Sequence, residues 1–198
     1  MTSLGQEIAA RATALPEGAP LTAKAFLHLG SRAAVDQVLS RLARKGTLLR
    51  IGRGVYVRPI LSRYGMHSPS TPKVIEGLAN HIGEPIAVSG ATAANALGLT
   101  TQVPAKEVYL TSGRNRRLKL GARTVEVRHA PAWQLVLPGH VAGDVVRALA
   151  WMGPERSGTA IGKLRTRLSA AELEEVAATR PRLPTWMAQQ VSALVHHA

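Results

Sequence analysis

Basic side chains are concentrated in residues 32–63, where eight of them stand against one acidic side chain, Asp36. They are Arg32, Arg41, Arg44, Lys45, Arg50, Arg53, Arg58 and Arg63. Guanidinium and ammonium groups at this density can neutralise the phosphates of a nucleic acid. A solvated surface of a basic protein has the same composition, so the interpretation depends on the elements that carry these residues.

Residues 32–45 have the pattern of an amphipathic helix. The apolar positions at the i, i+3, i+4 and i+7 spacing of one buried stripe are Val35, Val38, Leu39 and Leu42. Ser31 precedes the helix, where a hydroxyl can accept from the free N–H groups of the first turn, and Gly46 follows it, where a left-handed cap is easiest. The sequence therefore marks both ends of this helix.

The segments on either side complete a recognisable order. Residues 23–28 form a shorter helical candidate that Thr22 can cap, and 29–31 make a tight turn into the helix at 32–45. Two β-prone runs follow, at 48–51 and 55–57, joined by a glycine-flanked loop with Arg53 at its tip. We predict a winged helix-turn-helix domain over 1–62.

The DNA contacts expected from residue chemistry lie on this helix and hairpin. Arg32 suits guanine and Gln37 suits adenine, because their side chains can make paired hydrogen bonds to those base edges. Arg53 is expected to reach the minor groove or a flanking phosphate. Backbone phosphates are expected to be neutralised by Arg41, Arg44 and Arg58.

The rest of the chain predicts a second, α+β domain. The Gly-, Ser- and Pro-containing stretch within 63–71 is the expected linker, and the second domain is expected to cover 72–198. Strands are predicted at 86–88, 107–111, 117–120 and 123–128, and helices at 73–82, 91–97, 141–152, 159–168 and 169–179. The last of these opens on a capping-box pattern, Ser169 to Glu172.

A second basic segment lies between residues 114 and 128, where six basic side chains accompany one acid, Glu126. A hairpin would place several of them on one side. This segment is a second phosphate-contacting surface, a docking site for an acidic or nucleic-acid partner, or a solvated hairpin.

Patterns typical of enzymes are absent from the sequence. It contains no phosphate-binding G-x-x-x-x-G-K-[ST] loop, no H-E-x-x-H and no G-x-S-x-G motif. Cysteine is absent and the seven histidines include no His-x-x-x-His pair, so we expect no metal site, no cofactor and no enzymatic activity. The formal net charge of +13 favours a polyanionic partner. With no long apolar run and no charged-then-apolar start, a cytoplasmic protein without a membrane partner is expected.

Three segments together resemble the AbiEi-type antitoxins of bacterial type IV toxin–antitoxin systems, including the shorter AbiEi-like proteins. They are Arg53–Val57, Ser89–Gln102 and Val108–Ser112 with the basic segment after it. The resemblance implies a winged helix that binds operator repeats and represses its own operon. It also implies a C-terminal domain that opposes a nucleotidyltransferase-like toxin, without a stable complex between the two proteins.

The resemblance also assigns residues. The DNA contacts that it implies are Ser31, Arg32, Ala33, Gln37, Arg41, Arg50, Arg53 and Arg58, and the antitoxin surface that it implies is Arg114, Arg116, Arg117 and Lys119. The DNA is expected to be double-stranded, with inverted repeats on which copies of the protein can associate. Two alternatives stay open: a stand-alone winged-helix regulator without a toxin partner, and a nucleic-acid-binding module with nucleotide-linked activity, in which the junction at 89–101 holds a phosphate.

Overall fold

The computed structural model describes residues 3–63 and 65–195, and its mixture of helices and strands confirms the α+β class. The chain forms two compact units. Unit 1 comprises Met1–Glu84 and Arg117–Val125, and unit 2 comprises Pro85–Arg116 and Glu126–Ala198.

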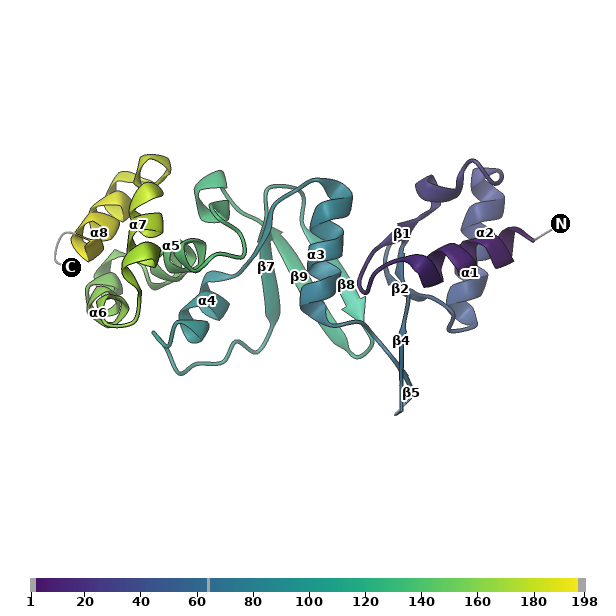
Figure 1. Cartoon of the computed structure of the whole chain (residues 1–198), viewed down its shortest axis with the longest axis horizontal. Helices are drawn as coiled ribbons and strands as arrows, with labels where there is room; N and C mark the ends of the chain where they lie inside the picture. Colours follow the sequence, from purple (N-terminus) through teal and green to yellow (C-terminus); the bar gives the residue numbers. More distant parts are fainter. Residues whose placement is uncertain (1–2, 64, 196–198) are drawn as a thin grey trace. The chain divides into compact units, whose positions relative to one another are not determined.

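Unit 1 begins with a helix, a short strand and a helical turn (Figure 1). Its elements are α1 (Leu4–Ala14), β1 (Leu21–Thr22), the 3₁₀ helix η1 (Ala23–Phe26), α2 (Arg32–Arg44), β2 (Leu49–Gly52), β3 (Val55–Val57), β4 (Ile60–Ser62), β5 (Gly65–His67) and α3 (Thr71–Ile82). The first three strands form a sheet in the order β1-β3-β2. The helix expected at 23–28 is one 3₁₀ turn; Thr22 precedes it at the cap position, but its side chain makes no capping hydrogen bond.

Helix α2 has the ends that the sequence predicts. The hydroxyl of Ser31 accepts a hydrogen bond from the N–H of Ala34, and Gly46 adopts a left-handed backbone with φ of 77°. The apolar stripe of α2 lies in the core of unit 1, where Val35 and Leu39 are fully buried and Val38 nearly so. The phenolic oxygen of Tyr56 on β3 lies 3.4 Å from the Ser40 hydroxyl, which joins the hairpin to α2.

The expected linker, 63–71, contains the strand β5, which pairs with β4 immediately before the linker; Tyr64 lies outside the described residues. The helix after it, α3, belongs to unit 1 rather than starting the second unit. Its contact with the loop before β1 explains this placement: the backbone N–H of Ser70 donates to Glu17, and a methyl group at Gly77 would lie 2.6 Å from the Gly18 carbonyl oxygen.

Unit 2 is mainly helical, with a sheet on one side (Figure 1). Its elements are β6 (Ile86–Val88), α4 (Gly90–Ala96), β7 (Glu107–Thr111), the 3₁₀ helix η2 (Ala132–Leu135), α5 (Val141–Met152), α6 (Pro154–Arg165), α7 (Ala170–Ala178), the 3₁₀ helix η3 (Arg180–Arg182) and α8 (Thr185–Val195). The strands β8 (Arg116–Leu120) and β9 (Arg123–His129) belong to unit 2 only in part. The sheet has the order β6-β7-β9-β8, and the tip of the β8–β9 hairpin, residues 117–125, belongs to unit 1.

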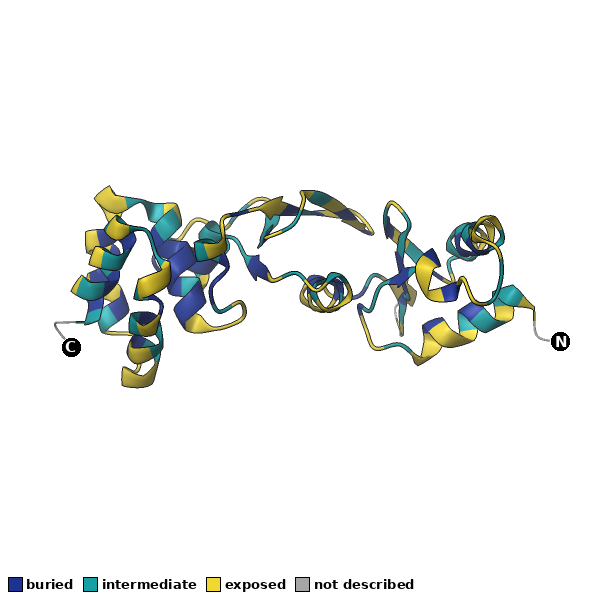
Figure 2. Ribbon diagram, turned by 90° about the horizontal axis from the view of Figure 1, so that it is seen from above, coloured by how far each residue is buried: buried dark blue, intermediate teal, exposed yellow. Residues whose placement is uncertain are grey.

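Helix α5 is the centre of unit 2 and is buried over most of its surface (Figure 2). It packs against α4, α6 and α7, and the core that they share includes Ala93, Val145 and Leu149, all fully buried. Helix α6 begins at Pro154, five residues before the predicted start, in agreement with the preference of proline for the first helical turn.

Helix α7 has the predicted capping box. The Glu172 carboxylate accepts from the backbone N–H and the hydroxyl of Ser169, and these hydrogen bonds lower the pKa of Glu172 below its ordinary value.

Among residues 3–63 and 65–195, no helix is long and apolar enough to cross a membrane.

Candidate nucleic-acid interface

The solvent-facing side of α2 carries three of the predicted contact residues. Ala33, Gln37 and Arg44 are all exposed. At about 100° per residue they lie within about 40° of one another around the helix axis. They are opposite the stripe that enters the core, so this face presents an amide, a guanidinium and a small methyl group to solvent.

Arg32 and Arg41 lie on the two flanks of this face. Arg32 is about 140° from Gln37 around the axis, so the two predicted base readers do not share a side of the helix. The Nε of Arg32 donates to the Asp36 carboxylate at 2.7 Å, and both side chains are exposed. An exposed pair of this kind is worth little and can exchange for a phosphate contact. On the other flank, a guanidinium nitrogen of Arg41 lies 3.4 Å from where a methyl group of Gly5 on α1 would be.

The β2–β3 hairpin presents its basic residues at the turn. Gly54 has φ of 69°, a conformation that glycine adopts easily, and the pairing register shifts between Arg50 and Gly52. Arg53 and Arg50 are exposed, and the Nε of Arg50 donates to the Gly52 carbonyl. Arg58 differs, because it is half-buried and its Nε has no hydrogen-bond partner among the described residues.

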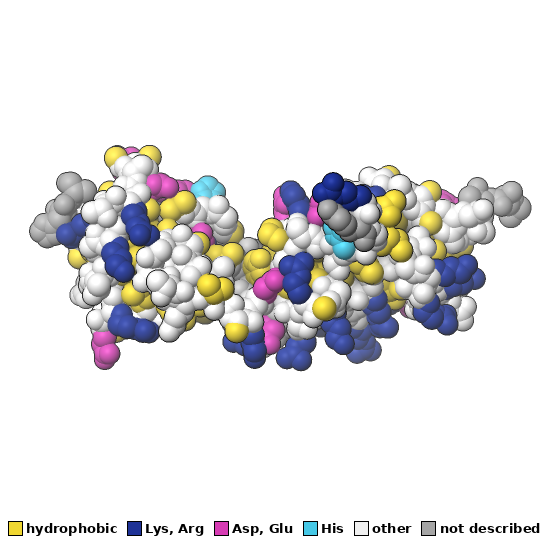
Figure 3. All heavy atoms as spheres, turned by 90° about the horizontal axis from the view of Figure 1, so that it is seen from below, with side chains coloured by type: hydrophobic (Ala, Val, Ile, Leu, Met, Phe, Trp, Pro, Cys, Tyr) yellow, Lys and Arg dark blue, Asp and Glu magenta, His cyan; other side chains and the backbone are white. Residues whose placement is uncertain are grey.

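A groove of about 560 Å³ separates the C-terminal half of α2 from β2. Ser40 and Arg44 line it from the helix, and Leu49 and Arg50 line it from the strand. Figure 3 shows Lys and Arg side chains gathered over the N-terminal unit on the face that it presents. Two guanidinium groups on the walls of one groove are suited to a polyanionic backbone.

The second basic segment is divided between the two units. Arg114 and Arg116 belong to unit 2, whereas Arg117 and Lys119 lie at the hairpin tip in unit 1. Arg117 and Lys119 are exposed and alternate with the buried Leu118 and Leu120, as the period of a strand requires. Leu118 lies beside the β2–β3 hairpin, with its Cδ2 3.8 Å from where a methyl group of Gly52 would be.

The sequence of residues 7–176 matches a family of unknown function, DUF6088, across parts of both units. The chain belongs to this family. No curated protein and no solved structure matches it.

The described residues include no group of three or more His, Asp or Glu side chains that could hold a metal ion. The arrangement on unit 1 is suited to binding phosphates and base edges. Two basic residues of unit 2 line a cavity: Arg128, the last residue of the second basic segment, and Arg147, which we did not select from the sequence. Arg147 gave a signal in the sequence, because Arg147 and Asp144, three residues apart, are the charged residues in the otherwise apolar segment of α5.

Proposed function

We propose that this DUF6088 member is a DNA-binding regulator whose unit 1 is a winged helix-turn-helix, with α2 as the helix that enters the major groove. The order helix, strand, helical turn, helix and hairpin supports this proposal, as does the strand order β1-β3-β2. The observation that carries it is the exposed face of Ala33, Gln37 and Arg44 on α2, next to exposed arginines on the following hairpin. The major groove of B-DNA is wide enough for a helix with side chains of this size.

In this arrangement Gln37 is the principal reader of base edges, since its amide can pair with both N6 and N7 of adenine. Arg44 and Arg50, on the two sides of the groove, contact backbone phosphates. Arg53 at the hairpin turn reaches the minor groove or the next phosphate. Arg32 at the start of α2 exchanges its pair with Asp36 for a base or phosphate contact.

We further propose that the regulator is the antitoxin of a type IV toxin–antitoxin system in the cytoplasm, which represses its own operon and counteracts a nucleotidyltransferase-like toxin. The resemblance to AbiEi-type antitoxins supports this step. A stand-alone regulator is the competing proposal. A nucleotidyltransferase-like gene immediately downstream favours the antitoxin, and its absence favours the stand-alone regulator.

The first test is a titration of the full chain with the duplex that lies immediately upstream of its own gene, and with a scrambled duplex of equal length. Operator recognition should give a specific affinity about a thousandfold or more above the affinity for the scrambled duplex. Equal affinity for the two duplexes would contradict the proposal of an operator reader.

Replacing the proposed base reader should relax sequence preference. Gln37→Ala should weaken binding to the upstream duplex by about tenfold or more and leave binding to the scrambled duplex unchanged, because only an amide–base pair is lost. Arg44→Ala should weaken both by a similar factor, because it removes a phosphate contact. Gln189→Ala, an exposed glutamine on α8, is the matched control. Equal loss on both duplexes in the Gln37 variant would remove Gln37 from this role.

The hairpin tip is expected to add a phosphate contact. Lys119 is exposed in the same unit as α2, so Lys119→Ala should weaken both duplexes by about two- to tenfold and lower the salt slope by about one. Lys106→Ala, an exposed lysine of unit 2, should leave DNA binding unchanged. If the Lys119→Ala variant bound DNA normally but no longer protected cells from the toxin, the Lys119 side chain would instead belong to the antitoxin surface.

A further inference from the structure

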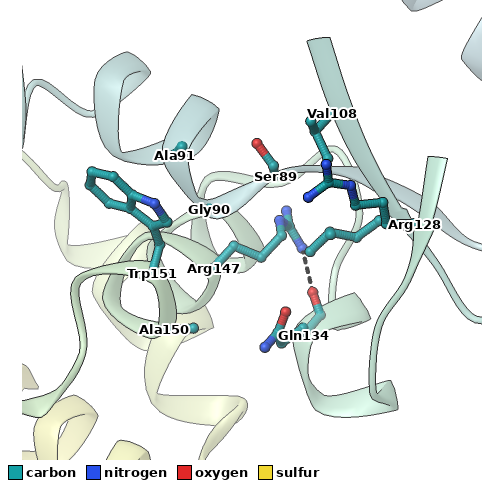
Figure 4. A pocket seen from close by; sticks show the side chains of 10 residues that line it. Ser89, Gly90, Ala91, Val108, Arg128, Gln134, Arg147, Ala150 and Trp151 are labelled. Carbon is teal, nitrogen blue, oxygen red and sulfur yellow. Dashed lines mark hydrogen bonds between the residues drawn. The ribbon is translucent and has the colours of Figure 1, made fainter. Parts of the chain in front are cut away.

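A cavity of about 300 Å³ opens in unit 2 (Figure 4), and none of the residues that line it is one that we assign to DNA. Its walls come from the start of α4, the strands β7 and β9, the helix η2 and one face of α5. The charged residues of its lining are Arg128 and Arg147, and none of the residues that line it is an aspartate or a glutamate. The charged side chains that face the cavity are therefore cationic, and each is paired with a carboxylate outside the lining, Arg147 with Asp144 and Arg128 with Glu126.

Arg147 is buried, with 1% of its surface exposed, and it is the one charged residue among the described residues that is buried. Its Nη2 donates to the Asp144 carboxylate at 2.6 Å, and its Nη1 donates to the carbonyl oxygens of Gln134 and Val136. The Nε is buried and has no hydrogen-bond partner among the described residues. A buried cationic N–H without an acceptor is costly, so an oxyanion in the cavity would satisfy it.

Arg128 supplies a second cation from β9. Its guanidinium is bound to the Glu126 carboxylate on the same strand, while 54% of its side chain remains exposed. Figure 4 shows the side chains of Arg128 and Arg147 pointing toward each other, with the hydroxyl of Ser89 nearby. Both guanidinium groups can donate paired hydrogen bonds to phosphate or carboxylate oxygens, so an oxyanion between them could accept from each.

The remaining walls of the cavity are largely apolar. Trp151 and Ala150 lie on α5, and Val108 and Leu110 lie on β7. In Figure 4 the indole of Trp151 lies on the opposite side of Gly90 from the two arginines. A volume of about 300 Å³ with a few convergent polar groups is typical of a small-molecule site.

We propose that this cavity binds a small organic ligand with an oxyanion group, a phosphate monoester or a carboxylate, attached to a flat apolar part. The oxyanion lies between Arg128 and Arg147 and accepts from the Ser89 hydroxyl. The apolar part extends toward Trp151. The protein is then a regulator with an effector site in unit 2, which goes beyond the proposed recognition of DNA.

The test is a calorimetric titration of the full chain, at about 150 mM salt, with three probes: AMP, phenylacetate and inorganic phosphate. Saturable binding of AMP and phosphate would identify a phosphate site, and binding of phenylacetate alone would identify a carboxylate site. Adenosine, which lacks the oxyanion, should bind at least about tenfold more weakly than AMP. Absence of saturable binding by all three probes would overturn the proposal.

Variants locate the ligand. Arg128→Gln should weaken the binding probe by about tenfold or more, whereas Arg182→Gln, an exposed arginine of unit 2 outside the cavity, should leave it unchanged. Glu126→Gln should preserve or strengthen binding, because it removes a negative charge beside Arg128. Arg128→Gln also removes the positive charge beside the Glu126 carboxylate, and that carboxylate would then repel an anion. Glu126→Gln measures the effect of the Glu126 charge separately from the direct contact of Arg128 with the ligand. Equal affinity in the Arg128 and Arg182 variants would place the ligand elsewhere and overturn the proposal.

Discussion

Raising the salt concentration from about 50 to about 200 mM should weaken binding of the upstream duplex by about three orders of magnitude. The estimate assumes about six phosphate contacts, each of which contributes about 0.9 to the slope of log affinity against log salt. Unit 1 has enough exposed arginines and lysines for this number, including Arg41, Arg44, Arg50, Arg53 and Lys119. The measurement is a series of fluorescence-anisotropy titrations at four or more salt concentrations.

The scrambled duplex is the internal control for this result. It should show a similar slope at a lower affinity, because phosphate contacts are shared by specific and random DNA. Arg44→Ala should reduce the slope by about one. A slope near zero for both duplexes would contradict a binding mode that depends on these cations, and with it the assignment of α2 and the β2–β3 hairpin to the DNA backbone.

Gly90→Ala should destabilise unit 2 by about 1–3 kcal/mol or more, the typical cost of overpacking a core. A methyl group at Gly90 would lie 2.4 Å from the carbonyl oxygen of Arg147 and 2.6 Å from the Cβ of Trp151. Both atoms belong to α5. One is a backbone oxygen and the other is a Cβ, which is fixed by the backbone, so a side-chain rotation cannot relieve the clash. The helices α4 and α5 would have to separate, and the core that contains Ala93 and Val145 would lose contacts.

Urea denaturation followed by tryptophan fluorescence measures this effect, because Trp133, Trp151 and Trp186 all lie in unit 2. Gly162→Ala is the matched control. Gly162 lies within α6, and no atom is within 4 Å of where its methyl group would be. This substitution should stabilise the protein by about 0.5–1 kcal/mol through helix propensity. If Gly90→Ala were as stable as the unsubstituted protein, close packing of α4 on α5 would not explain the glycine.

The features that the sequence predicts correctly are those with local causes. The bounds of α2 follow from Ser31, Gly46 and the apolar period of the helix, and the capping box of α7 follows from Ser169 and Glu172. In each case the interacting groups are within a few residues of one another, so the side-chain types suffice. The start of α6 at Pro154 also had a local signal, a proline directly after Gly153, that the prediction at 159 did not use.

The features that only the tertiary structure decides depend on residues far apart in the chain. The contact of Gly77 with Gly18 places α3 in unit 1, and the packing of Leu118 beside Gly52 places the hairpin tip there as well. Neither contact leaves a periodic trace in the sequence. The cavity also depends on distant residues, because Arg128 lies on the strand β9 and Arg147 lies on the helix α5, and only the fold brings these two elements together. Side-chain types and spacing determine the helices, the strands and the basic surface of α2, because these features depend on neighbours along the chain. Which segments form each unit, and which residues line the cavity, depend on how closely distant surfaces fit together. Only packing in three dimensions decides these features.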